Sequence, residues 1–80
     1  MELKEIILTK EWCKKHHNEK FFIVINKNSW LMAHCIVEKN NTLNIMIDCA
    51  ENLHINRYRT FKIGEFINDY GYFKTFYLKF

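Results

Sequence analysis

A run of twenty residues, WLMAHCIVEKNNTLNIMIDC from Trp30 to Cys49, decides the fold of this chain. Its second half has the period-two pattern of a strand with one buried face, with apolar side chains at Leu43, Ile45, Ile47 and Cys49. Its first half, residues 30–38, is rich in strand-forming residues. Residues 39–42 between them contain Asn40-Asn41, and an Asn pair suits the positive φ angles of a tight turn. The run therefore predicts a β-hairpin.

The register of this hairpin decides which side chains lie on each face of the sheet. A turn with an odd number of residues pairs Cys35 with Ile45 and gathers the aliphatic residues on one face, whereas an even number mixes the two sets. We favour the odd turn because it buries aliphatic residues together. The opposite face then carries a mixed set: Trp30, Met32, His34, Met46 and Asp48. Such a face is either covered by a second helix or serves as an interaction surface, since Met and Trp are common in binding sites.

Further strands are predicted on both sides of the hairpin. Residues 3–8 form a first strand or an apolar staple, and residues 21–25 form a strand of five β-preferring residues. Residues 72–80 close the chain as an aromatic strand. Residues 53–59 are ambiguous between a strand and an ordered loop, because Leu53 and Ile55 alternate with polar residues.

Two short helices complete the expected fold. Thr9 is a suitable N-cap for a helix through His17, and Thr60 for a helix over residues 61–70. Gly71 stands where a left-handed residue would end the second helix. The chain is therefore expected to be one α+β domain over residues 1–80, with a small antiparallel sheet of four to five strands and one or two short helices packed on one face.

Composition limits the classes of function. Thirteen of the 80 residues are aromatic, enough for a thin core that leaves little room for a deep substrate pocket. The net charge of +3 is mild for a nucleic-acid binder. Three cysteines do not make a disulfide framework, and the acidic start of the chain is unlike a signal peptide, so a cytoplasmic location is expected. There are two glycines but nine asparagines, so Asn is expected to supply the turns.

Histidines and cysteines offer three chemical alternatives, each with a simpler explanation. Cys13, His17, Cys49 and His54 would make a Cys2His2 zinc set, although their spacing is unlike that of common structural sites. Cys13 beside His16 and His17 would make a thiolate–imidazolium pair, and His34 facing Asp48 an acid–base pair. We expect buried structural cysteines, no metal or cofactor, and no catalytic site.

Two further features point to macromolecular partners. The segment Arg57-Tyr58-Arg59, followed by Lys62, interleaves cations that suit phosphates with an aromatic ring that suits a base. The closing strand, if it lies at a sheet edge, offers unpaired backbone groups for homodimerisation; the alternative is a fully paired central strand.

These features together predict a small non-enzymatic interaction protein whose partner is a protein. The expected contact residues are Trp30, His34, Arg57, Tyr58, Arg59 and Lys62. An inhibitor or regulator encoded by a phage or mobile element, acting against a bacterial nuclease or immune complex, is one role for such a chain. The alternative is a nucleic-acid-binding domain that uses the segment Arg57-Tyr58-Arg59.

Overall fold

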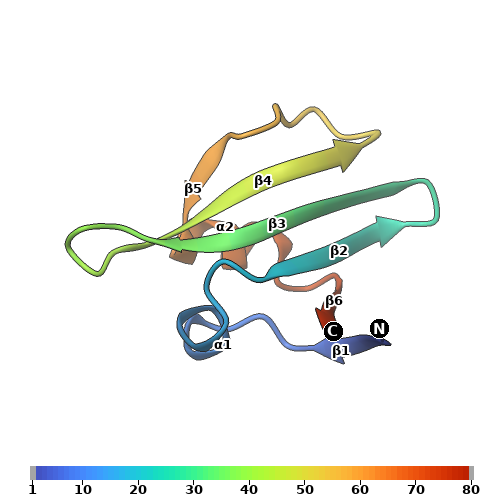
Figure 1. Cartoon of the computed structure of the whole chain (residues 1–80). Helices are drawn as coiled ribbons and strands as arrows, with labels where there is room; N and C mark the ends of the chain where they lie inside the picture. Colours follow the sequence, from blue (N-terminus) through green and yellow to red (C-terminus); the bar gives the residue numbers. More distant parts are fainter. Residues whose placement is uncertain (1, 80) are drawn as a thin grey trace.

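A computed structural model of the chain describes residues 2–79 and shows six strands and two helices (Figure 1). The elements in chain order are β1 (Glu2–Ile6), α1 (Lys10–Lys15), β2 (Lys20–Asn26), β3 (Ser29–Val37), β4 (Leu43–Glu51), β5 (Thr60–Lys62), α2 (Ile63–Tyr70) and β6 (Lys74–Lys79). All strands pair antiparallel in one sheet of order β1-β6-β2-β3-β4-β5. The predicted α+β class is confirmed, with six strands where four to five were expected.

The closing strand β6 lies inside the sheet, between β1 and β2 (Figure 1). Leu78 pairs with Leu3 on one side, and Phe76 pairs with Phe22 on the other. Of the two positions left open by the sequence, the strand therefore takes the central, paired one, and its backbone offers no free edge for homodimerisation. The reason is long-range: the last strand returns to the start of the chain and pairs with β1 on one side and β2 on the other. Phe80, the predicted end of the strand, lies outside the described residues.

The β3–β4 hairpin has the predicted odd register. Cys35 pairs with Ile45 and Val37 with Leu43, across a five-residue turn in which Asn41 has a φ of 60°. Farther from the turn a β-bulge shifts the register, so that Ala33 pairs with Ile47 but Met32 with Cys49. The bulge makes Asp48 the extra residue and reverses the faces beyond it. Cys49, predicted on the buried face, is consequently half-buried and lies opposite Met32.

The helices begin and end partly as predicted. The Thr9 side chain caps α1 by accepting a hydrogen bond from the Trp12 amide at 3.0 Å. Helix α2 begins later than predicted, because Thr60 belongs to β5 and pairs with Met46. Gly71 is right-handed, with a φ of −66°, and not left-handed as predicted. Glycine is needed there because a Cβ would collide with the Ile67 carbonyl oxygen.

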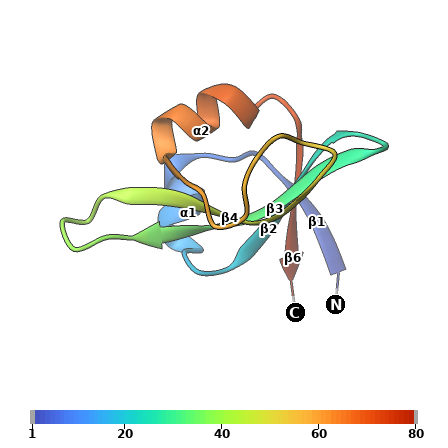
Figure 2. The same ribbon diagram turned by 90° about the horizontal axis from the view of Figure 1, so that it is seen from above.

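One face of the sheet carries the hydrophobic core. Phe21, Ile23, Leu31, Ala33 and Ile45 are fully buried there, and both helices add buried side chains, Cys13 from α1 and Phe66 from α2. Figure 2 shows α2 lying against one side of the sheet only. The predicted packing of helices on one face is confirmed. Three asparagines, Asn18, Asn41 and Asn52, take positive φ angles, as their abundance predicted.

No helix within residues 2–79 has both the length and the apolar character needed to cross a membrane.

Candidate binding surface on the open face of the sheet

The second face of the sheet is not covered by either helix, and we call it the open face. Strand alternation and the pairing register place on it ten large side chains, most of them half-buried and all partly exposed: Leu3, Phe22, Val24, Trp30, Met32, His34, Ile36, Met46, Phe76 and Leu78. When one face of a sheet is turned to water, the residues along its strands normally alternate, with apolar side chains on the core face and polar ones on the water face. This sheet is instead apolar on both faces over its central strands.

A shallow groove of about 540 Å³ lies across the open face. Its apolar walls come from four adjacent strands, with Leu3 from β1, Phe76 and Leu78 from β6, Phe22 and Val24 from β2, and Trp30 from β3. The rings of Phe22 and Trp30 are 6.3 Å apart, an aromatic pair at contact distance. Leu3 is 61% exposed, so the groove is wide open at its β1 side. The groove is thus open and apolar, and it is not an enclosed cavity.

A polar cluster stands beside the groove at the Asp48 bulge. The Asp48 carboxylate lies 2.9 Å from His34 Nδ1 and 3.9 Å from Lys20 Nζ. Arg57 donates from Nε to the Asp48 carbonyl oxygen at 2.9 Å. The predicted facing of His34 and Asp48 is confirmed. Arg57 also contacts the bulge. The two predicted contact regions, the sheet face with His34 and the segment that begins at Arg57, therefore meet at Asp48.

The loop between β4 and β5 presents Tyr58 in an unusual backbone conformation. Its φ is 68°, which is a sparsely populated region for a bulky residue, and its side chain is 60% exposed. Hydrogen bonds hold the loop: the Tyr58 amide donates to the Ile47 carbonyl and the Ile47 amide donates to the Arg59 carbonyl. Such strain costs about 1–3 kcal/mol and is found preferentially at functional sites.

The basic residues of this loop are partly engaged by aromatic rings. The Arg57 guanidinium lies 4.8 Å from the Tyr58 ring centre, and that of Arg59 lies 4.4 Å from the Phe61 ring centre. Lys62 is exposed on β5, opposite Asn44. Arg57 and Tyr58 therefore lie on one exposed loop, and His34 on β3 is linked to that loop through Asp48. Trp30 lies apart from them in the groove, and Lys62 lies at the far end of β5.

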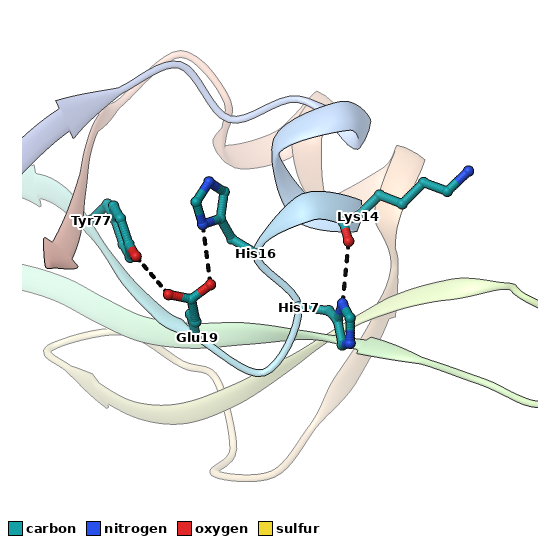
Figure 3. A network of polar contacts seen from close by, with 5 residues as sticks. All are labelled: Lys14, His16, His17, Glu19 and Tyr77. Atoms are coloured by element: carbon teal, nitrogen blue, oxygen red, sulfur yellow. Dashed lines mark hydrogen bonds and ion pairs between the residues drawn. The ribbon is translucent and has the colours of Figure 1, made fainter. Parts of the chain in front are cut away.

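A second cluster of aromatic and polar side chains joins α1 to β6 on the other face. Tyr77 donates to one Glu19 oxygen at 2.5 Å, and His16 Nδ1 lies 3.1 Å from the other (Figure 3). Trp12 stacks on His16 with ring centres 4.5 Å apart. The hydrogen bond from Tyr77 lowers the pKa of the Glu19 carboxyl, and the same bond raises the pKa of the Tyr77 phenol. Sequence reasoning missed this link because Glu19 and Tyr77 are 58 positions apart.

The environment of Cys13 does not suit a nucleophile. Its thiol is buried, and desolvation, with a smaller effect from Cys35, raises its pKa to about 12. The proposed pairing with the neighbouring histidines is contradicted: His16 faces Glu19, and His17 Nδ1 lies 3.2 Å from the Lys14 carbonyl oxygen (Figure 3). A thiol held neutral in this way is a structural residue.

The four residues of the candidate zinc set do not converge. Cys13 belongs to the core and Cys49 to the opposite side of the sheet. Among residues 2–79 no group of three or more histidine, cysteine or acidic side chains is placed to hold a metal ion.

Comparison of the chain with protein-family models, with curated proteins and with solved structures found no match.

Proposed function

We propose that this chain is a non-enzymatic interaction protein and that the open face of its sheet binds a protein partner. The observation that carries the proposal is the groove of about 540 Å³ walled by Phe22, Trp30 and Phe76. A few residues carry most of the binding energy of a protein–protein interface, and Trp is enriched among them. A sheet face turned to water is normally polar, and a large exposed apolar patch is typical of an interaction site.

The surface area of the chain supports the proposal. A monomeric protein of 9.8 kDa is expected to expose about 5,200 Å². This chain exposes 5657 Å² and measures 37 × 28 × 20 Å, so it is flatter and more exposed than average. An excess of exposed surface is what an uncovered sheet face would produce, and a partner would bury it.

The polar cluster at Asp48 supplies the orientation that an apolar groove lacks. His34, Asp48 and Lys20 form a chain of contacts at the margin of the groove. Paired charges at the rim of an interface fix the register of the partner and suppress wrong partners. Arg57 and the exposed Tyr58 extend this rim along the β4 side. We propose a role as an inhibitor or regulator that acts by occupying a surface of its partner.

Nucleic-acid binding through the β4–β5 loop is the second candidate. The exposed Tyr58 ring with Arg57 beside it favours base stacking next to a phosphate contact. It is the weaker proposal because Arg57 already donates to Asp48, and Arg59 packs over Phe61. Affinity for a single-stranded oligonucleotide should then fall steeply with salt, and should fall further in the Arg57→Ala, Arg59→Ala double variant.

A pull-down from an extract of the native cell tests the leading proposal. The tagged chain is compared with a Trp30→Ser variant, and with Tyr72→Ser as the matched control because Tyr72 is 82% exposed and lies outside the sheet. We expect a captured protein that resists nuclease treatment, is lost with Trp30→Ser and is retained with Tyr72→Ser. Capture that is equal for all three proteins, or lost on nuclease treatment, would contradict binding by the open face.

A further inference from the structure

We infer that a second copy of this chain binds to the open face, packed face to face about a two-fold axis that runs along the strands between β2 and β3. This inference rests on the proposed function, because it takes the open face as the binding surface and names one occupant of it. It depends on the order of the side chains across the sheet, which is its own complement.

One row of side chains crosses the open face near the β2–β3 turn. Val24 lies beside Lys74 on one side and beside Trp30 on the other, and Trp30 lies beside Glu51. From β6 to β4 the row therefore consists of a cation, two apolar side chains and a carboxylate. Lys74 and Glu51 are both exposed, and neither has an ion-pair partner within residues 2–79.

A two-fold axis between β2 and β3 exchanges the two ends of this row. Lys74 of each copy then lies opposite Glu51 of the other, and Val24 lies opposite Trp30. Both ion pairs form together, because a two-fold interface uses the same patch of each copy. Within one chain Lys74 and Glu51 cannot pair, since three strand spacings, about 14 Å in all, separate β6 from β4.

The next row of the open face fits the same axis. Phe22 lies beside Phe76 and Met32, and Met32 lies beside Cys49. The axis places Phe22 opposite Met32 of the other copy and Phe76 opposite Cys49, so that apolar side chains meet throughout the row. Aligned sheets pack about 10 Å apart with their strands within about 30° of each other. Lysine and glutamate side chains extended from both sheets bridge that gap.

The other charges of the face fall into three groups under this axis. Lys20 and Asp48 already contact each other within the chain. Glu5, one strand beyond Phe76, is carried one strand beyond Cys49 of the other copy, to the loop from which Arg57 donates to the Asp48 carbonyl oxygen. Lys27 stands at the β2–β3 turn, at the end of the axis, and is the one cation that the symmetry brings near its own counterpart.

The alternative aligned arrangement does not match the charges. A two-fold axis that crosses the strands through the row of Phe22 places Lys74 against Leu78 of the other copy and Val24 against Lys20, because each pair is four positions apart on one strand. Burying a charge against an apolar side chain without a partner is costly. A row that is its own complement is what an interface between two copies requires, whereas an unrelated partner imposes no such order.

The test is the oligomeric state of charge variants, measured by analytical ultracentrifugation over a series of concentrations. The wild-type mass should rise from 9.8 kDa toward twice that value with concentration. Lys74→Glu and Glu51→Lys should each weaken the dimer about tenfold or more, because each then places two like-charged contacts in every dimer. Lys39→Glu, in the exposed β3–β4 turn, is the matched control and should associate like wild type.

Mixing the two variants is the decisive step. An equimolar mixture of Lys74→Glu and Glu51→Lys should associate as tightly as wild type, because each contact between them joins a carboxylate to an ammonium group. Such a rescue also shows that both variants are folded. Lys27→Gln should tighten the wild-type dimer, since it removes the like charges at the end of the axis.

Two results would overturn the inference. A mass of 9.8 kDa at every concentration removes the second copy, and a dimer that the mixture does not rescue removes this axis. In either case a pull-down that depends on Trp30 leaves the proposed function standing, with another protein as the occupant. A rescued dimer with capture that ignores Trp30 means that the face binds only its own copy, and the role as a regulator of another protein then fails. Dilution dissociates the dimer, so the face is free for another protein at low concentration.

Discussion

Phe21 and Phe22 are neighbours on β2 that face opposite sides of the sheet, so their replacement by Ala separates the roles of the two faces. Phe21 is fully buried, with its ring 5.9 Å from Trp12 and 6.2 Å from Phe66. Deleting a buried Phe side chain costs about 3–5 kcal/mol. An 80-residue domain has about 4–12 kcal/mol in all. Phe21→Ala is therefore expected to remove between about a quarter and all of that stability.

Phe22 is only half-buried, and it contacts Trp30 across the open face. Its replacement by Ala removes one cross-strand aromatic pair and part of its buried surface, at about 1 kcal/mol. Urea unfolding followed by circular dichroism measures both variants. With a slope of about 1 kcal/mol per molar, the midpoint should fall by about 1 M for Phe22→Ala and about 3 M or more for Phe21→Ala. Equal losses would show that the open face stabilises the fold as much as the core does, and would refute our reasoning.

Three further predictions concern the loop, the thiols and the α1–β6 cluster. Tyr58→Gly should leave the free energy of unfolding unchanged or raise it by up to about 1 kcal/mol in thermal denaturation, because glycine relieves the strain at a φ of 68°; a clear loss would mean that the ring supports the fold. In native protein, iodoacetamide should modify Cys49 before Cys13, as read by peptide mass, because burial raises the pKa of the Cys13 thiol to about 12; the reverse order would contradict this placement. The lowered pKa of Glu19 stabilises the fold above the carboxyl's unfolded pKa, and this contribution is lost as the pH falls through the folded pKa. The difference in Tm between wild type and Glu19→Gln should therefore shrink as the pH is lowered from neutral to about pH 3. A difference in Tm that stays constant with pH would show that the hydrogen bond from Tyr77 to the ionised Glu19 carboxylate does not stabilise the fold.

Local patterns predicted the local parts of the fold. The Asn40-Asn41 turn and the pairing of Cys35 with Ile45 follow from alternation and turn chemistry, which act over a few residues. The cap at Thr9 is equally local. The bulge at Asp48 was not predictable, because alternation alone gives no sign that one residue is inserted. Thr60 was misread as a cap because its pairing with Met46 depends on a strand fourteen positions away.

The candidate site was predictable only in part for the same reason. Trp30 and His34 were placed on the correct face because both belong to the hairpin. The rest of the groove comes from β2 and from β1 and β6, the two ends of the chain. The pairing of β1 with β6 is a long-range event that periodicity does not encode. Because the sequence left the closing strand between an edge and a central position, its contribution to the wall of the groove was not predicted.

The most direct test of the central claim is a carbene footprint of the chain, free and bound to the captured partner. This label reports the exposure of apolar side chains one residue at a time. We predict that partner binding suppresses labelling of Phe22, Trp30 and Phe76 in the groove and leaves Tyr72 unchanged. Protection confined to Tyr58, with the groove labelled as before, would contradict the claim that the open face is the binding surface.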